Sequence, residues 1–268
     1  MHFYPSKIIL FGEHTLLYGS EGLAIPGHRY QGRWNTGSAR HHGTDLFALA
    51  DYLAAQSFHN PVDHRRMTED AASGWFFDSD IPVGYGAGSS GAYSAAIYDR
   101  YGDIRNENPF LIKEDLALIE SFFHGSSSGI DPLISYYNRP FHLKEGRPEK
   151  VDLPTGIMDA FSLIDTKIPR QGSAYIQLFR QKMEEPVFAG KIRETLIPAC
   201  ARSIAAAIAG DLDLLRSSFY EISYFQLVWM PEFIPIPWIR IWEHRLSDST
   251  GFLKICGAGG GGFLLEIK

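Results

Sequence analysis

Short apolar runs and periodic apolar stretches alternate along the chain and predict a mixture of strands and helices. Residues 7–11 (KIILF) form an apolar run that ends at Gly12, which predicts a buried strand. Residues 15–34 alternate loosely between apolar and polar positions and predict another strand or two. Further strands are expected near 74–78, as a pair around Glu145 and Gly146 within 139–154, at 161–165, and on both sides of a glycine turn in 251–268.

Helical spacing of apolar residues predicts helices at 45–56, 92–101, 109–123, 188–209 and 211–230. Asp45 is a suitable N-cap for the first of these, and Ser89 or Ser90 for the second. We expect Pro198 to break the fourth, because proline removes a backbone donor inside a helix.

The balance of elements divides the chain near residue 155. Strand-rich sequence gives way to helix-rich sequence at 154–156, and a chain of 268 residues is long enough for two modest domains. We therefore expect an α+β protein with an N-terminal domain over 1–155 and a C-terminal domain over 156–268.

Composition excludes several classes of partner and compartment. The net charge of -6 argues against a nucleic-acid binder, which usually carries a basic excess. Two cysteines, Cys200 and Cys256, are too few for a disulfide framework, which fits a reducing cytoplasm. The apolar run in 8–11 is followed at once by Glu13 and His14, so we expect neither a signal peptide nor a membrane span there.

Glycine clusters provide the first chemical signal. Residues 84–91 form a glycine-rich loop that leads into a predicted helix, an arrangement suited to holding phosphate oxygens, although an ordinary turn with a capped helix has the same pattern. Residues 86–91 and 257–262 both match GxGxxG, but neither lies between a firm strand and a helix as a dinucleotide site requires. An NAD-dependent oxidoreductase is therefore disfavoured, and no GxxxxGK[ST] motif is present.

Phosphoryl transfer needs a phosphate cradle, oxygen ligands for Mg²⁺, a cation near the reacting oxygens and a group that handles the proton of the nucleophile. Lys7, Ser90, Glu120 and Asp131 could supply these parts. Their spacing alone does not single them out.

Four blocks of sequence resemble the GHMP kinases and, within them, the mevalonate kinases. Residues 5–19 (PSKIILFGEHTLLYG) are similar to the opening P-G-K-V-I-L-x-G-E-H-x-x-V-Y-G of that family, and residues 82–92 (PVGYGAGSSGA) to P-x-G-x-G-L-G-S-S-A-A. Residues 124–131 (HGSSSGID) resemble H-G-x-P-S-G-x-D, and 254–263 the closing glycine block. The four blocks occur in the family's order and cover about a sixth of the chain.

The resemblance implies roles for matching residues near the reaction. Asp131 takes the position of the catalytic aspartate that accepts or orients the substrate's hydroxyl proton, and Lys7 that of the lysine paired with it. Ser90 matches the serine that binds Mg²⁺, and Glu120, eleven residues before Asp131, matches the second Mg²⁺ ligand. The ATP-binding loop would comprise Gly84, Gly86, Ala87, Gly88, Ser89, Ser90 and Gly91.

Further residues would bind the substrate by the same resemblance, namely Glu13, His14, Thr166, Gly259 and Gly260. The implied fold has two domains, the first like the second domain of a ribosomal protein of the small subunit and the second a ferredoxin-like α/β sandwich. The implied cofactors are ATP and Mg²⁺, the implied pathway is isoprenoid biosynthesis, and the implied partner is a small-molecule substrate. A homodimer is left open.

The implied reaction transfers the γ-phosphoryl group of ATP to a primary alcohol, with mevalonate as the first choice of acceptor. Phosphomevalonate or a sugar is the alternative, and so is a non-catalytic nucleotide or metabolite sensor with the same fold. The chain has Leu16 and Leu17 where galactokinases continue with D-Y after G-E-H-T, which argues against a sugar.

Several departures from the family pattern mark this chain. The segment between Gly19 and Pro82 is short, at 62 residues, which leaves the adenine site open. The loop has Ala87 in place of the usual Leu and Gly91 in place of Ala, and Ser127 replaces the usual Pro before Asp131.

Overall fold

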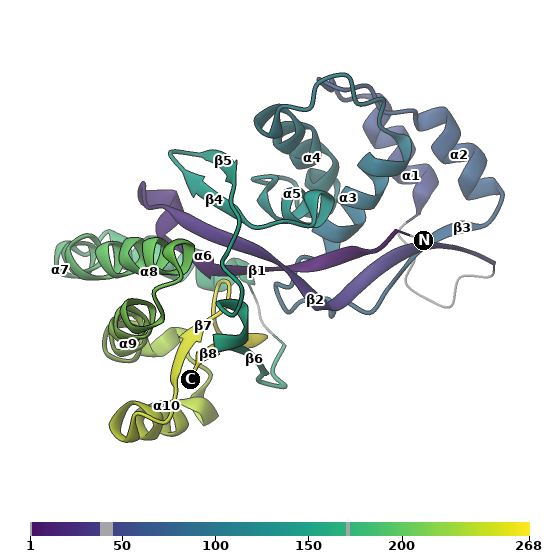
Figure 1. The fold of residues 1–268 in the computed structure, drawn as a ribbon. Helices are drawn as coiled ribbons and strands as arrows, with labels where there is room; N and C mark the ends of the chain where they lie inside the picture. Colours follow the sequence, from purple (N-terminus) through teal and green to yellow (C-terminus); the bar gives the residue numbers. More distant parts are fainter. Residues whose placement is uncertain (1, 38–44, 170–171) are drawn as a thin grey trace. The chain divides into compact units, whose positions relative to one another are not determined.

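Two long strands begin the fold (Figure 1), in a computed structural model that describes residues 2–37, 45–169 and 172–268. The predicted strand at 7–11 forms β1 (Tyr4–Phe11), and the loosely alternating stretch after it forms a single strand, β2 (Gly22–Thr36). Gly12 ends β1 with a φ of 100°, and a Cβ there would lie 2.6 Å from the carbonyl oxygen of Glu21, so only glycine fits this position.

The chain folds into two units, each built from several separate segments of the sequence. Unit 1 takes the described residues within 1–7, 25–82 and 87–139, and unit 2 takes 8–24, 83–86 and the described residues within 140–268. The β1 and β2 strands therefore contribute to both units. The predicted domain boundary near residue 155 divides the sequence into two consecutive parts, whereas these units group residues by their contacts. The boundary stays a prediction.

Unit 1 contains five helices among its described residues, and they lie on the same side of its strands (Figure 1). The strand β3 (Trp75–Ser79) pairs antiparallel with the end of β2, with Phe77 opposite Trp34. The helices are α1 (Leu46–Ala54), α2 (His64–Ala72), α3 (Ser89–Tyr101), α4 (Pro109–His124) and α5 (Ile130–Tyr137). The buried α3 packs closely against both α4 and α5, which places the glycine loop beside the residues that these helices carry.

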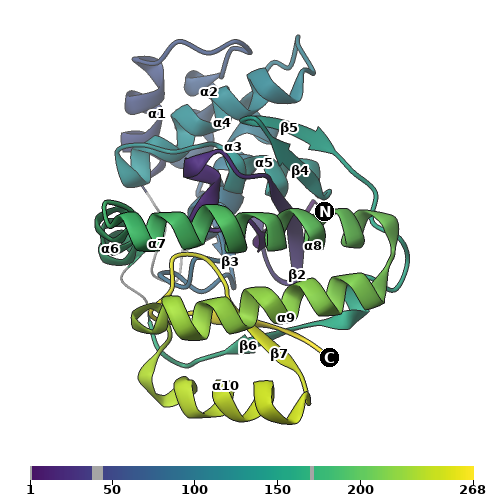
Figure 2. The same ribbon diagram turned by 90° about the vertical axis from the view of Figure 1, so that its left-hand side faces the viewer.

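Unit 2 contains a three-stranded sheet in the order β6-β8-β7, formed by β6 (Phe161–Asp165), β8 (Phe263–Ile267) and β7 (Phe252–Ile255). A hairpin of β4 (Phe141–Lys144) and β5 (Arg147–Lys150) turns at Glu145 and Gly146, as expected, and pairs with the start of β2. The helices and short helical turns are η1 (Thr15–Tyr18), η2 (Met158–Ala160), α6 (Gly172–Met183), α7 (Pro186–Lys191), η3 (Ile192–Leu196), α8 (Ile197–Ala209), α9 (Leu212–Trp229), η4 (Pro231–Phe233) and α10 (Ile236–Asp248). Figure 2 shows α8, α9 and α10 side by side, with α9 and α10 against β7.

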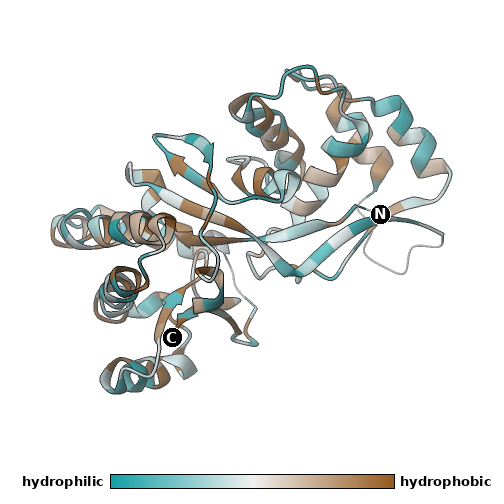
Figure 3. Ribbon diagram, viewed as in Figure 1, coloured by the Kyte–Doolittle hydropathy of each residue, from teal (hydrophilic) through white to brown (hydrophobic). Residues whose placement is uncertain are grey.

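Hydrophobic burial explains which elements the sequence pattern could predict. Leu10 and Phe11 at the end of β1 are fully buried, and this end of the strand is hydrophobic in Figure 3. In contrast, α2 is almost entirely hydrophilic in the same view, and Met67 is its only buried residue. The pattern therefore predicted β1 and missed α2.

Two predictions about helix ends are wrong. The N-cap of α3 is Gly88 in the left-handed region, rather than Ser89 or Ser90, which both lie inside the helix. Pro198 does not break its helix, since α7 continues into α8 through the π-helical turn η3. In that turn the N–H of Ile197 donates to the carbonyl of Ile192, one residue further back than in an α-helix, so the backbone adjusts just before the proline.

Candidate active site

The predicted functional residues fall into two groups, one in each unit. Lys7, Ser90, Glu120 and Asp131 all lie in unit 1. The residues predicted to bind substrate, Glu13, His14, Thr166, Gly259 and Gly260, all lie in unit 2. The glycine loop is shared, with Gly84 and Gly86 in unit 2 and its remaining predicted residues, Ala87, Gly88, Ser89, Ser90 and Gly91, in unit 1.

An ion pair joins Lys7 in β1 to Asp131 in the first turn of α5. Lys7 Nζ donates to Asp131 Oδ2 over 2.7 Å, and the two residues are 124 positions apart in sequence. The lysine side chain is 7% exposed and the aspartate side chain 28%, so the ammonium is buried while the carboxylate keeps access to solvent. The pair places a buried positive charge beside a carboxylate that solvent can reach.

The glycine loop runs directly past this ion pair. The backbone N–H of Lys7 donates to the carbonyl of Ala87 over 2.9 Å, which fixes the loop to β1. A Cβ on Gly88 would lie 3.5 Å from Lys7 Cβ and 3.7 Å from Asp131 Oδ2. The first turn of α3 follows and carries no acidic side chain, so its N–H groups are suited to an anion.

Gly91 sets the spacing between α3 and α5. A Cβ at this position would lie 2.9 Å from both the Cβ and the carbonyl carbon of Asp131, closer than such contacts normally come. The absence of a side chain therefore lets α3 approach the helix that carries Asp131.

We expect Gly91→Ala to lower kcat, because the added methyl group pushes α5 and its aspartate away. Overpacking of this kind costs about 1–3 kcal/mol in stability, and a displacement of the aspartate by about 1 Å would cost roughly 10²-fold in rate. Gly190→Ala is the matched control, since a Cβ there meets no atom within 4 Å. Parent-like kcat in Gly91→Ala would contradict this interpretation.

Ser90 and Glu120 form a second group of oxygen atoms beside the loop. Ser90 Oγ donates to Glu120 Oε1 over 3.0 Å, and His124 Nε2 lies 2.9 Å from the same hydroxyl oxygen. When Glu120 is ionised, the Ser90 hydroxyl gives its single proton to Glu120, so that the imidazole N–H of His124 donates to Ser90 and one lone pair of Ser90 is left. Glu120 and His124 are four residues apart on α4 and therefore share one face.

These oxygen atoms suit a divalent cation that also binds phosphate. Within residues 2–37, 45–169 and 172–268, no group of three or more His, Cys, Asp or Glu side chains is arranged to hold a metal ion. Mg²⁺ commonly takes one or two carboxylates and completes its octahedron with water and substrate phosphates. Ser90 and Glu120 supply hard oxygen donors of this kind, so the residues present fit Mg²⁺.

Burial, together with the neighbouring Asp131 carboxylate, raises the pKa of Glu120 from 4.5 to about 7. Hydrogen bonds from Ser127 and Ser90 act in the opposite direction but do not cancel the effect. The side chain is therefore partly protonated near neutral pH, and a bound cation would favour its ionised form.

This shift predicts that the protein without metal loses stability as pH rises. A carboxyl with a raised pKa in the folded state contributes stability that is fully present below 4.5 and is lost as pH rises through about 7. Each pH unit between the two values is worth about 1.4 kcal/mol, so we expect the free energy of unfolding of Glu120→Gln, relative to the parent, to rise by up to about 3 kcal/mol between pH 5 and 8.

Urea unfolding in the presence of a chelator measures this difference. Glu232→Gln is the control, because the hydrogen bond from Lys182 helps to lower the pKa of Glu232 below its ordinary value, and that carboxyl does not titrate between pH 5 and 8. A difference between Glu120→Gln and the parent that stays the same at both pH values would contradict the raised pKa.

In unit 2, the predicted substrate residues surround the C-terminal glycine block. The Glu13 carboxylate is 5% exposed and accepts from Lys254 Nζ over 2.5 Å, and Lys254 is 1% exposed. His14 has a φ of 65°, and its Nε2 lies 3.0 Å from the carbonyl oxygen of Ala258. Lys254 is not among the residues that the sequence predicts for the site, although it is the first residue of the closing glycine block, 254–263. Contact of Glu13 and His14 with an acceptor stays a prediction.

Thr166 and two glycines hold the same block in shape. Thr166 Oγ1 donates to the carbonyl of Gly262 over 2.7 Å, and its backbone N–H donates to the same oxygen. The N–H of Gly260 donates to the carbonyl of Phe233, and a Cβ on Gly260 would overlap the Tyr175 ring. A Cβ on Gly259 would lie 2.9 Å from the carbonyl oxygen of Phe233, so both positions require glycine. Substrate binding by Thr166, Gly259 and Gly260 stays a prediction.

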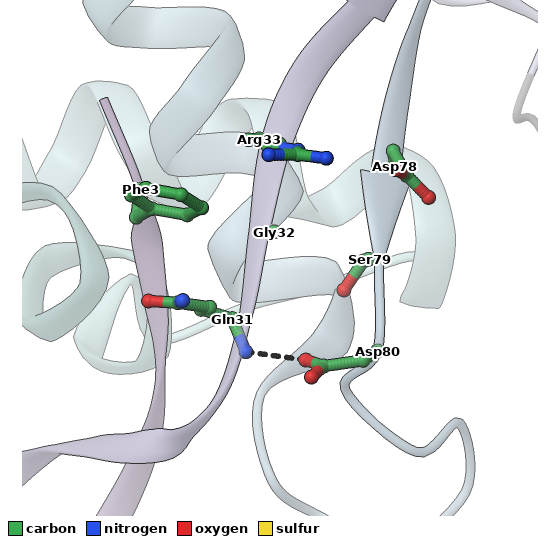
Figure 4. Close-up of a pocket in the computed structure, with 7 residues that line it drawn as sticks. All are labelled: Phe3, Gln31, Gly32, Arg33, Asp78, Ser79 and Asp80. Atoms are coloured by element: carbon green, nitrogen blue, oxygen red, sulfur yellow. Dashed lines mark hydrogen bonds between the residues drawn. The ribbon is translucent and has the colours of Figure 1, made fainter. Parts of the chain in front are cut away.

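A pocket of about 230 Å³ opens elsewhere in unit 1, at the edge between β2 and β3 (Figure 4). Its lining residues are Phe3, Gln31, Gly32, Arg33, Asp78, Ser79 and Asp80. Asp80 Oδ1 accepts from the backbone N–H of Gln31, which closes one wall. Pockets for drug-sized ligands span roughly 300–1,000 Å³, so this pocket is too small for a nucleotide, and it contains none of the predicted site residues.

No helix within the described ranges combines the length and the apolar character that crossing a membrane requires. Cys200 and Cys256 are both buried, and neither forms a disulfide bond. Burial raises the pKa of Cys200 to about 12, so this thiol is inert at neutral pH.

Comparison with known proteins gives sequence relatives across nearly the whole chain. No protein-family model matches it. A mevalonate kinase of Pyrococcus abyssi (strain GE5 / Orsay) is 30% identical over 300 residues, covering 98% of this chain and 87% of that protein. A mevalonate kinase of Thermococcus onnurineus (strain NA1) is 28% identical over 306 residues, with the same coverage.

Solved structures share the fold at lower identity. L. major mevalonate kinase in complex with R-mevalonate superposes with a TM-score of 0.67 at 15% identity, covering 99% of this chain and 86% of that chain. Streptococcus pneumoniae phosphomevalonate kinase in complex with phosphomevalonate and AMPPNP gives a TM-score of 0.68 at 14% identity, with coverage of 100% and 91%. These structural likenesses do not separate one acceptor from another.

Proposed function

Because the chain belongs to the GHMP kinases, in the family of the mevalonate kinases, we propose that it transfers the γ-phosphoryl group of ATP to a primary alcohol. The proposed acceptor is mevalonate, and the proposed product is 5-phosphomevalonate. The observation that carries the proposal is the Lys7–Asp131 ion pair, which lies beside the glycine loop and next to the Ser90–Glu120 oxygens.

In this proposal, the Asp131 carboxylate accepts the proton of the attacking hydroxyl. It is exposed enough to meet a substrate, and Lys7 holds one of its oxygens. The Lys7 ammonium, which is buried, stabilises the negative charge that develops on the alcohol oxygen. Catalysis then consists mainly of positioning and charge stabilisation, as phosphoryl transfer requires.

The phosphates of ATP are proposed to bind at the glycine loop and the N-terminus of α3. The loop is Gly84–Gly91, and its N–H groups and the helix dipole favour an anion. Ser90 and Glu120 are proposed to hold Mg²⁺, which when bound neutralises charge on the phosphate oxygens. The two residues already face each other, so the ligands need little rearrangement to bind a cation.

A second acceptor in the same reaction class is phosphomevalonate or a sugar, and a non-catalytic sensor is the alternative outside it. The sensor is disfavoured because Lys7, Asp131, Ser90 and Glu120 keep both their identities and their mutual contacts. The proposed reaction belongs to isoprenoid biosynthesis in the cytoplasm, and a homodimer stays a proposal that the oligomeric state in solution would test.

A coupled assay of ADP release tests the proposal. The purified protein is given Mg²⁺ and ATP together with mevalonate, phosphomevalonate, galactose or homoserine. We expect turnover with mevalonate above the other three acceptors. Turnover with phosphomevalonate or galactose instead would show that mevalonate is not the acceptor. ATP binding with no turnover on any of the four acceptors would favour a non-catalytic sensor.

A further inference from the structure

Ser127 forms hydrogen bonds beside the proposed active site, but the proposed function gives it no role. It lies in the loop between α4 and α5, at the position where the family pattern has proline. Its hydroxyl donates to Glu120 Oε2, and it accepts the backbone N–H of Gly129 over 2.9 Å. Proline could make neither side-chain bond, so neither contact can form where the family pattern has proline.

The two oxygens of the Glu120 carboxylate are thereby held by two different serines. Ser90 donates to Oε1 and Ser127 to Oε2, while the side chain is buried. The terminal torsion of a glutamate is otherwise broad, so a single hydrogen bond would leave the plane of the carboxylate free to rotate. Two donors on opposite oxygens fix that plane and leave further lone pairs on each oxygen for a cation.

The loop that carries Ser127 is itself fixed at both ends. Gly125 ends α4 in the left-handed region, and Gly129 begins α5 in the same region. A Cβ on Gly129 would lie 2.1 Å from the carbonyl oxygen of Lys113, so this residue packs directly on α4. Ser127 therefore connects Glu120 to the start of the helix that carries Asp131, two residues after Gly129.

We propose that Ser127 is a positioning residue of the cation site, whose hydroxyl holds the Glu120 carboxylate in the orientation that binds Mg²⁺. The inference rests on the proposed function, since the cation is the one that phosphoryl transfer requires. Ser127 itself touches neither the cation nor the substrate. It acts only through Glu120 and through the loop that leads to Asp131.

Neighbouring serines provide a matched control. Ser128 is exposed, and its hydroxyl accepts a hydrogen bond from the N–H of Ile130 over 3.4 Å. Ser128→Ala removes the same atoms from the same loop without changing the contacts of Glu120. Ser127→Thr keeps a hydroxyl at the position and serves as the conservative rescue.

The test is the affinity for Mn²⁺ in the presence of ATP, measured by electron paramagnetic resonance with no acceptor present. Loss of a hydrogen bond that orients a metal ligand typically weakens metal binding by about 10–100-fold, and we expect a loss of about tenfold in Ser127→Ala. Ser127→Thr and Ser128→Ala should bind Mn²⁺ as the parent does. If Ser127→Ala does not fold, Ser127→Cys replaces it, because a thiol is only a weak donor.

Three results would overturn the inference: parent-like Mn²⁺ affinity in Ser127→Ala, equal losses in Ser127→Ala and Ser128→Ala, or no Mn²⁺ binding by the parent. Turnover of mevalonate by the parent is measured separately, on the same protein preparation after mevalonate is added. Turnover with an Mn²⁺ affinity that does not depend on Ser127 removes the inference alone. Mn²⁺ binding that depends on Ser127, without turnover of mevalonate, supports the inference and removes the proposed acceptor.

Discussion

Asp131→Asn should lower kcat by about 10²–10⁴-fold, the usual contribution of a general base. Asparagine keeps the shape of the side chain, but it cannot accept the hydroxyl proton and it carries no charge to pair with Lys7. The affinity for ATP should stay close to that of the parent, because the glycine loop and the N-terminus of α3 are unchanged. Steady-state kinetics with ATP and mevalonate, together with a direct titration of ATP, separate the two effects.

Asp103→Asn is the matched control for this variant. Asp103 is also a carboxylate of unit 1 with a cationic partner, Arg105, but its side chain is 62% exposed and has no predicted role. We expect parent-like turnover from Asp103→Asn. Parent-like turnover from Asp131→Asn would contradict the proposed role of the aspartate, whatever the acceptor.

Lys7→Met should lower kcat by about 10²–10³-fold, the typical loss when one group that stabilises developing negative charge is removed. Methionine fills a similar volume and has no charge, so the change removes the ammonium with little loss of packing. Lys7→Arg should not restore activity, because the 7%-exposed side chain leaves little room for a planar guanidinium. The measurement is again kcat with ATP and mevalonate, with thermal unfolding to check the fold.

Lys182→Met is the control for Lys7→Met. Lys182 is likewise a mostly buried lysine, 16% exposed, that pairs with a carboxylate, Glu232, over 2.7 Å. The effects of Lys7→Met and Asp131→Asn should also be far from additive, since each removes the partner of the other. Additive losses in the double variant would show that the two side chains act independently.

Much of the fold could be predicted from the sequence, because the elements with a strong apolar pattern bury the apolar side chains that form it. The strand at 7–11, the helix capped by Asp45 and the hairpin at Glu145 and Gly146 all appear as expected, and Asp45 accepts from the N–H of Phe47. The α+β class and the GHMP kinase fold are confirmed by the elements and by the structural relatives.

The elements that were missed have weak or misleading patterns. The helix α2 buries only Met67, so its apolar spacing carries no signal. The sequence pattern predicts no helix after residue 230, whereas Pro235 and Pro237 stand at the start of α10, where a proline without an N–H costs little. Gly88 took the N-cap position of α3 because the loop needs a left-handed residue there, which freed Ser90 to face Glu120.

The residues of the candidate site could be predicted from the sequence, but the hydrogen bonds between them could not. The resemblance to the family selected Lys7, Asp131, Ser90 and Glu120, and the structure brings them together as two neighbouring pairs. The role of Ser127 could not be predicted, because its hydrogen bonds depend on the path of a loop rather than on a repeating pattern. His124 could have been found, since a spacing of four places it on the helix face of Glu120.

The identity of the phosphorylated product tests the proposed reaction most directly. The parent protein is incubated with Mg²⁺, ATP and mevalonate, and the products are followed by ³¹P nuclear magnetic resonance, with Asp131→Asn alongside. We predict one new phosphomonoester signal, assigned to 5-phosphomevalonate, that grows as ADP forms and is absent with the variant. ADP formation without this signal, or the same signal at the same rate from Asp131→Asn, would contradict the proposed reaction.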